Sequence, residues 1–236
     1  MQTVILAGGK GTRLKPYTTV FPKPLMPIGD TPILEVVIRQ LKYYGFYDIV
    51  MAVGHLKELI QTFFNNGTKW AVDIRYSIED KPLGTAAPLA LIDHLENNFL
   101  VMNGDVLTDL NYRAFFEYHK TNRALCTIAM YKKPVHIDLG ILRLNEANEL
   151  TDYTEKPTLH YQVSMGVYAF KKEVLSYIPQ NEYFDFPDLI KKLLAENKKV
   201  VGFPFDGYWL DIGRPADYEQ ALDFFNAHKE DFLKEK

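Results

Sequence analysis

The chain has 236 residues, of which 47% are hydrophobic and 24% charged, and its net charge is −3, so we expect a globular protein without the basic face that a nucleic-acid partner requires. It contains no apolar run near the ~20 residues of a membrane helix, no signal-peptide pattern, and a single cysteine, Cys126, that cannot form an internal disulfide. These features predict a cytoplasmic protein with no membrane partner.

The first half of the chain alternates short apolar runs with helical patterns. Helices are predicted near residues 31–44, 56–64 and 85–95, between strands at residues 3–7, 48–53, 72–77 and 99–102. This alternation favours a parallel sheet with helices on both faces. We therefore predict a Rossmann-like α/β fold with three layers (α/β/α) and a central mixed, mostly parallel sheet. Ligands of such sheets bind beyond the carboxyl ends of the strands.

The second half has shorter connections between its predicted strands, so we expect a mixed or antiparallel part that covers the sheet edge. Its predicted strands lie at residues 124–131, 140–144, 149–153, 162–170, 200–203 and 208–210, and its helices at residues 171–177, 186–197 and 215–228. The charged residues 229–236 are expected to form a solvated helix end. Because no linker or internal repeat separates the halves, we expect one domain over residues 1–236.

A glycine-rich bend follows the first predicted strand, in the sequence LAGGKGTRL at residues 6–14. Glycines allow a sharp turn whose N–H groups stay accessible. Four cations and no acidic residue occur before Asp30: Lys10, Arg13, Lys15 and Lys23. The bend matches neither the P-loop pattern nor the dinucleotide-binding fingerprint. A glycine bend surrounded only by positive charge predicts a polyphosphate-binding loop.

The string G-G-x-G-T-R-L-x-P, followed by P-K-P at residues 22–24, resembles the sugar-1-phosphate nucleotidylyltransferases, also called nucleotide-sugar pyrophosphorylases. This resemblance implies a glycosyltransferase-A-like nucleotidyltransferase fold. It also implies a reaction in which a nucleoside triphosphate and a sugar 1-phosphate give a nucleotide sugar and pyrophosphate. Many relatives carry a C-terminal β-helix of hexapeptide repeats, and we expect none here. The sequence leaves the oligomeric state open, with a homo-oligomer as one alternative.

Two anions meet in this reaction, so cations must neutralise them. Mg²⁺ prefers one or two carboxylates together with phosphate oxygens. Asp105 follows a predicted strand, and Asp211 ends an aromatic-rich strand before a glycine, so both are predicted metal ligands. The resemblance implies that Arg13 contacts the β- and γ-phosphates and that Lys23 contacts the α-phosphate or the sugar phosphate. Asp109 is expected to cap a helix rather than bind metal.

The resemblance also implies which residues contact the nucleotide: Leu6, Ala7, Gly8, Gly9, Gly11, Thr12, Glu79, Pro82, Gly84, Thr85, Asn103 and Gly104. The run P-L-G-T-A at residues 82–86 resembles the stand-alone guanylyl-transferring branch that makes GDP-mannose. Ala87 departs from that branch, where glycine is frequent. GTP is the expected nucleotide, with UTP, dTTP, CTP and ATP as alternatives.

The sequence E-K-P at residues 155–157 resembles the family's sugar-side motif. Residues implied on this side are Gly140, Glu155, Lys156, Ser164 and Gly166, although many relatives have asparagine in place of Ser164. A mannose- or manno-heptose-1-phosphate is the expected acceptor. The alternative from another class is a catalytically silent protein that binds nucleotide sugars. Such a protein is expected to lack Arg13, Lys23 or one metal aspartate, and all four residues are present.

Overall fold

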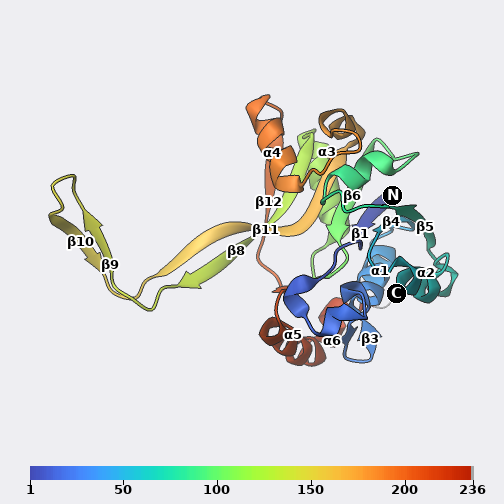
Figure 1. Ribbon diagram of the computed structural model, residues 1–236, viewed down its shortest axis with the longest axis horizontal. Helices are drawn as coiled ribbons and strands as arrows, with labels where there is room; N and C mark the ends of the chain where they lie inside the picture. The colour runs from blue at the N-terminus through green and yellow to red at the C-terminus, as the bar shows by residue number, and fades with distance from the viewer. Residues whose placement is uncertain (235–236) are drawn as a thin grey trace.

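The computed structural model describes residues 1–234, apart from the side chain of Asp211, and centres on a seven-stranded sheet (Figure 1). Its strand order is β12-β8-β11-β6-β1-β4-β5. The central strand β1 is parallel to both neighbours, β4 and β6, whereas β11 is antiparallel to β6 and β8. The predicted mixed, mostly parallel sheet is therefore confirmed. The strands span β1 (Gln2–Leu6), β4 (Asp48–Val53), β5 (Asp73–Ile78), β6 (Asn98–Asn103), β8 (Cys126–His136), β11 (Thr158–Lys171) and β12 (Val200–Phe205).

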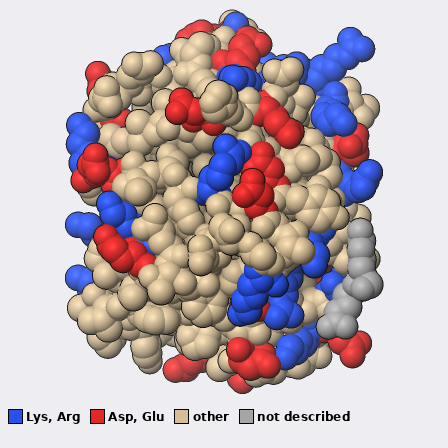
Figure 2. All heavy atoms as spheres, turned by 90° about the vertical axis from the view of Figure 1, so that its right-hand side faces the viewer, with Lys and Arg blue, Asp and Glu red and all other residues tan. Residues whose placement is uncertain are grey.

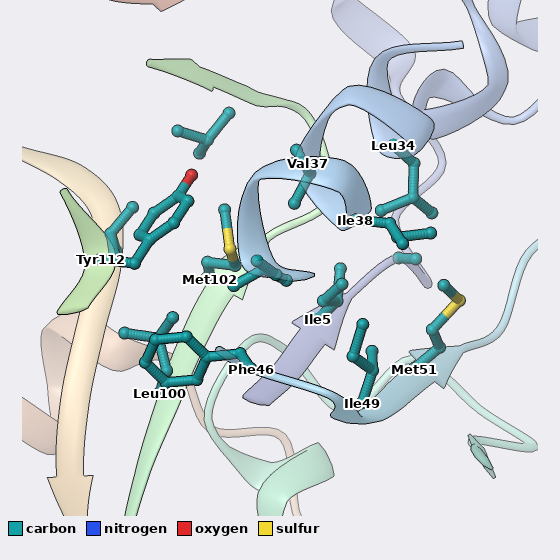
Figure 3. Close-up of a cluster of buried hydrophobic side chains, with 14 of the residues drawn as sticks. Ile5, Leu34, Val37, Ile38, Phe46, Ile49, Met51, Leu100, Met102 and Tyr112 are labelled. Atoms are coloured by element: carbon teal, nitrogen blue, oxygen red, sulfur yellow. The ribbon is translucent and has the colours of Figure 1, made fainter. Parts of the chain in front are cut away.

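Helical segments cover both faces of this sheet and give the three predicted layers. Side chains that alternate along each strand enter two separate cores. On one face, Leu34 and Ile38 of α1 pack against Ile5 and Ile49 (Figure 3). The helices in that core are α1 (Ile33–Tyr43), α2 (Lys57–Phe64) and α3 (Tyr112–Asn122). The opposite core is built on η5 (Ala87–Leu91), η6 (Lys172–Tyr177) and α4 (Phe186–Ala195), and contains Cys126 as a buried thiol.

A third core joins the two ends of the chain. It packs the α5–α6 segment against the N-terminal loops, with Phe225 and Phe232 fully buried beside Ile28 and Leu107. The expectation of a solvated tail is therefore wrong for α6, because Phe232 anchors it; residues 235–236 lie outside the described residues. The elements of this region are η1 (Thr12–Leu14), η2 (Tyr17–Thr19), η3 (Lys23–Leu25), β2 (Pro27–Ile28), β3 (Thr31–Pro32), β7 (Val106–Thr108), β13 (Trp209–Asp211), α5 (Pro215–Ala227) and α6 (Lys229–Phe232).

The helix predicted over residues 85–95 is reduced to the short 3-10 helix η5. The N–H groups of Ala86 and Ala87 both donate to the carbonyl of Phe184, 3.0 and 3.1 Å away, so the start of this segment is bonded to the loop that precedes α4. Pro88 then removes a further backbone donor. The segment at residues 172–177 is likewise 3-10 rather than α-helical.

Strands β8 and β11 continue beyond the sheet as a two-stranded ribbon that ends in the hairpin β9 (Ile141–Leu144) and β10 (Leu150–Thr154) (Figure 1). The expected mixed or antiparallel part does extend the sheet beyond β6, as β11, β8 and β12, but the strands predicted at residues 140–144 and 149–153 form a separate hairpin and do not cover the sheet edge. The pairing runs on from Met130 and Ser164 to His136 and Thr158, which carries the hairpin away from the body. We call residues 132–162 the arm.

The surface in Figure 2 carries acidic and basic side chains side by side, without a uniformly basic area on that face. Over residues 1–234, no helix is both long and apolar enough to cross a membrane.

Candidate functional site

The carboxyl ends of β1, β4 and β6 meet at one edge of the sheet, as expected for parallel neighbours. Backbone pairing continues past the strands, since Ala7 N donates to Ala52 O at 2.8 Å and Gly104 N donates to Leu6 O at 2.9 Å. A cavity of about 860 Å³ opens there, between the glycine bend and the loop that follows β5. The predicted ligand position beyond the strand ends is therefore hollow.

The glycine bend is fixed by its own backbone and by Thr18. Gly11 has φ +58°, and its carbonyl accepts hydrogen bonds from Thr18 Oγ1 at 2.7 Å and Leu14 N at 2.9 Å. A Cβ at Gly11 would lie 2.9 Å from Thr18 Cγ2. Leu14 is buried in the third core, which leaves Arg13 exposed at the cavity wall.

Lys23 is a buried cation aimed at an acid. Its backbone lies in η3, where Pro24 and Leu25 are also buried, and only 9% of Lys23 is exposed. Lys23 Nζ forms a hydrogen-bonded ion pair with Asp105 Oδ2, and both residues line the cavity. Because Lys23 is buried and paired with Asp105, the fold fixes its positive charge at the cavity floor.

Asp211 comes from the far end of the chain to the neighbourhood of Asp105. Strand β13 is antiparallel to β7, and Asp211 lies directly opposite Val106, the residue after Asp105. Opposite Cα atoms in such a pair are about 5 Å apart. The side chain of Asp211 lies outside the described part of the structure, but Gly213, two residues on, lines the cavity. Within the described residues no group of three or more His, Cys, Asp or Glu side chains could hold a metal.

Glu79 is enclosed by two glycines at the end of β5. A Cβ on either Gly8 or Gly54 would clash with the Glu79 carboxylate. Burial raises the pKa of Glu79, while a hydrogen bond from Leu83 N at 3.3 Å acts in the opposite direction. The carboxylate thus lines the cavity as a partly desolvated acceptor.

The loop around Gly84 is fixed by hydrogen bonds to Asp185, a residue that the sequence analysis did not assign to the site. Asp185 Oδ1 accepts hydrogen bonds from Thr85 N at 2.8 Å and Thr85 Oγ1 at 3.0 Å, and Tyr183 donates its hydroxyl to Asp185 Oδ2 at 2.5 Å. Gly84 has φ +89°, and a Cβ there would lie 2.7 Å from Phe184 O. An aspartate before a helix indicates only a cap, so the sequence held no signal of this distant contact.

Most of the residues predicted for the nucleotide line this one cavity. They are Leu6, Ala7, Gly8, Gly9, Gly11, Thr12, Glu79, Pro82, Gly84, Thr85 and Asn103, joined by Arg13, Lys23 and Asp105. Gly104 is buried and does not line the cavity, and its N–H donates to Leu6 O. Lining residues that the sequence analysis did not assign include Lys10, His55, Lys57, Tyr183 and Asp185.

The residues predicted for the sugar side are divided. Gly166, with φ +74°, lies against Asn103, and Ser164 Oγ donates to the Tyr168 hydroxyl at 3.0 Å, both below the cavity rather than in its lining. Gly140, Glu155 and Lys156 are on the arm and do not line the cavity (Figure 1).

Asp109 does not cap α3, contrary to expectation. Asn111 is the cap, because its Oδ1 accepts from Ala114 N at 2.9 Å. Asp109 Oδ1 accepts from Tyr208 N at 2.6 Å and so holds the approach to β13. A cap two residues later leaves the aspartate free to support the strand that carries Asp211.

The fold and the cavity define an α/β protein with a glycine-rich bend that lines a cavity at the carboxyl ends of its strands. The chain belongs to the nucleotidyl transferase family, whose model matches residues 2–228.

Two curated relatives match nearly the whole chain. It is 33% identical to a UTP–glucose-1-phosphate uridylyltransferase of Synechocystis, over 94% of this chain and 62% of the relative. It is 31% identical to a mannose-1-phosphate guanyltransferase of Candida albicans, over 100% of this chain and 69% of the relative. The chain therefore spans about two thirds of the length of these relatives.

Among solved structures, HddC from Yersinia pseudotuberculosis is similar with a TM-score of 0.75 and 25% identity, over 95% of this chain and 99% of that one. The same protein complexed with GMP-PN matches with a TM-score of 0.72.

Proposed function

We propose that this protein transfers a nucleotidyl group from a nucleoside triphosphate to a sugar 1-phosphate and releases pyrophosphate. The observation that carries this proposal is the cavity itself. It gathers the amide-lined glycine bend, the exposed Arg13, the buried Lys23 and the Asp105 carboxylate at one sheet edge. Family membership and the names of the curated relatives support the same reaction.

The proposed reaction needs no protein nucleophile. An ionised oxygen of the sugar phosphate attacks the α-phosphorus, a new P–O bond forms, and the bond to the departing pyrophosphate breaks. The obstacle is repulsion, since two like charges ~4 Å apart cost about 4 kcal/mol at an effective dielectric of 20. Lys23 fits a role at the α-phosphate because its position is fixed, while Arg13 on the bend can take two oxygens of the outer phosphates.

A divalent cation fits the acidic end of this cavity. The carboxylate of Asp105 already attracts the positive charge of the Lys23 ammonium, and it can attract a metal cation in the same way. The backbone register brings Asp211 beside it, and two carboxylates with phosphate oxygens form a donor set that suits Mg²⁺. We propose that Asp105 and Asp211 hold Mg²⁺. When bound, the ion neutralises phosphate charge and orients the triphosphate.

For the base, we propose guanine. Guanine presents two adjacent N–H donors on its pairing edge, whereas uracil and thymine present one. The Glu79 carboxylate offers two acceptor oxygens at the cavity wall, and among the described residues only one of them accepts a hydrogen bond, from Leu83 N. The guanyltransferase relative supports GTP with a mannose- or manno-heptose-1-phosphate, and the uridylyltransferase relative keeps UTP with glucose 1-phosphate as the second candidate.

The decisive test is a matrix of nucleoside triphosphates against sugar 1-phosphates with Mg²⁺, followed by pyrophosphate release. We expect the fastest release with GTP and mannose 1-phosphate or a manno-heptose 1-phosphate. A faster rate with UTP would select the second candidate. No release with any pair would overturn the proposed reaction and favour a nucleotide-sugar-binding protein. Since these substrates are cytoplasmic metabolites, we propose the cytoplasm as its location.

A further inference from the structure

The arm has no core of its own. None of residues 132–162 is buried, although the segment contains large apolar side chains. Those with at least 40% exposure are Val135, Leu139, Leu142, Leu144, Leu150, Tyr153 and Tyr161, and Leu139 reaches 74%. A two-stranded ribbon that buries nothing is at best marginally stable in water. The arm therefore presents an apolar surface that lacks a partner within residues 1–234.

The apolar side chains of the hairpin share one face. Leu142 and Leu144 alternate along β9, so both point to the same side. The register of the hairpin shifts between Leu150 and Asp152. On either side of this bulge, Leu150 lies opposite Leu144 and Tyr153 lies opposite Leu142, and opposite residues of an antiparallel pair lie on the same face. The four side chains form one continuous patch, which we call the hairpin patch.

Beside the hairpin patch, the arm assembles a polar cluster. Tyr153 donates its hydroxyl to Glu155 Oε2 at 2.5 Å, and a Cβ on Gly140 would lie 2.5 Å from that hydroxyl. Lys156 follows in a left-handed backbone conformation, with φ +43°. These exposed residues do not line the cavity of their own chain.

We propose that the arm docks on a second copy of this chain and brings Glu155 and Lys156 to the sugar-phosphate end of that copy's cavity. This inference rests on the proposed function. In a two-fold pair each copy receives what it gives, so one contact would cover both hairpin patches and complete both sites.

Charge supports a second copy as the occupant. Residues 138–155 contain five acidic residues and one basic residue. The cavity wall carries Lys10, Arg13 and Lys57, none of which has a hydrogen-bond or ion-pair partner among the described residues. The outer part of the arm, residues 138–155, is thus acidic, although Lys132, Lys133 and Lys156 nearly balance the charge of the arm as a whole. This acidic outer part and the three unpaired cations attract each other between copies.

The first test measures the oligomeric state by light scattering after gel filtration. We expect a dimer for the wild type and a monomer-shifted equilibrium, with at least a tenfold weaker association, for the double variant Leu142→Ser and Leu144→Ser. The matched control is Leu194→Ser on α4, which is 57% exposed, as is Leu142. A monomeric wild type, or equal weakening by the control, would overturn the proposal.

The second test asks whether the two halves of a site come from different chains. Arg13→Ala disables the cavity wall and Lys156→Ala disables the arm, so each variant alone should be nearly inactive. Differently tagged copies of the two variants are co-expressed, and pairs carrying both tags are purified. In a mutual exchange one of the two sites in each mixed pair is intact, so we expect about half of the wild-type rate.

Ala147→Ser, at an exposed and uncharged position in the turn between β9 and β10, is the control on the arm and should keep the wild-type rate. If the arm instead folds back on its own chain, the mixed pairs stay as inactive as the parents, which overturns the proposal. An inactive wild type that still forms a dimer sensitive to the hairpin patch would refute the proposed function and the delivery of Glu155 and Lys156, while the docking of the arm would stand.

Discussion

At the scale of residues, the contact between Lys23 and Asp105 sets the chemistry of the cavity. A buried ammonium against a partly buried carboxylate concentrates opposite charges in a small volume. Removing either partner leaves the other without compensation at the cavity floor.

Asp105→Asn should lower the rate of pyrophosphate release by about 10²–10³, because the amide has no charge to offer a metal or to balance Lys23. The measurement is kcat at saturating substrates with Mg²⁺, with circular dichroism to show that the fold persists. Asp93→Asn is the control, since Asp93 is exposed and absent from the cavity lining. Activity within a factor of two of wild type in Asp105→Asn would refute the role.

Glu79 makes stability depend on pH. Burial raises its pKa in the folded protein above the ordinary 4.5, so the folded state binds the proton more tightly than the unfolded state. That contribution to stability is fully present below the unfolded pKa and is lost as pH rises through the folded pKa.

Glu79→Gln should therefore raise the melting temperature near pH 7, while the variant and the wild type should melt closer together near pH 4. Glutamine also keeps an acceptor for Leu83 N. Thermal melts of the two proteins at both pH values test this. A difference that does not depend on pH would show that charge burial is not the cause.

At the scale of elements, the cavity depends on a loop held by a helix start. Thr85 donates two hydrogen bonds to Asp185 Oδ1, from its N–H and its hydroxyl, and Thr85 Oγ1 accepts a third from Phe186 N at 2.9 Å. Because the loop makes no α-helix of its own, these contacts fix the positions of Pro82 and Gly84 in the cavity wall.

Asp185→Asn should raise the KM for the nucleoside triphosphate several-fold and change kcat little, because a positioning residue is weakened without removing charge from the reacting phosphates. One weakened hydrogen bond corresponds to about 1 kcal/mol. Glu182→Gln, an exposed neighbour, is the control. A fall in kcat with an unchanged KM would contradict the positioning role.

Elements with strong local patterns were predictable. β4 matches its predicted residues 48–53 in full, and α1 and α5 begin and end within two residues of expectation. The failures have tertiary causes. Residues 85–95 form no α-helix because the N–H groups of Ala86 and Ala87 donate to the carbonyl of Phe184. The direction of the arm was not predictable, because alternation along a strand does not indicate what its two faces contact.

At the scale of the whole molecule, the third core connects residues 14–36 with residues 210–233. Gln40 reinforces it by donating to Thr108 O at 2.7 Å and to Phe232 O at 3.0 Å. The last helices thus hold the loops that carry Lys23 and the strand that carries Asp211.

Phe232→Ala should lower the free energy of unfolding by about 3–5 kcal/mol, because a fully buried ring leaves a cavity between α6 and its neighbours. Urea unfolding followed by circular dichroism measures this. Leu194→Ala removes an equally apolar but 57% exposed side chain and should cost under about 0.5 kcal/mol. A loss below 1 kcal/mol for Phe232→Ala would mean that α6 is not anchored.

The candidate site was predictable to the extent that its residues follow strand ends. Gly8 lies two residues beyond the end of β1, and Asn103 ends the neighbouring strand β6, so their convergence follows from parallel pairing alone. Asp185 and Lys57 also line the cavity, but no local pattern distinguishes them from a helix cap and a surface cation. Where the arm places Glu155 and Lys156 depends on long-range geometry that no motif encodes.

The central place of β1 also constrains how the protein is made. Synthesis proceeds from the N-terminus, so β1 emerges before both of its neighbours, β4 and β6, which follow about 50 and 100 residues later. The cavity around the glycine bend is complete only when Asp185, which holds Thr85, and β13, which pairs with β7, have also been made. On the ribosome, the glycine bend is thus made long before the residues that complete the cavity around it, and a product truncated before Asp185 would carry the bend without that cavity.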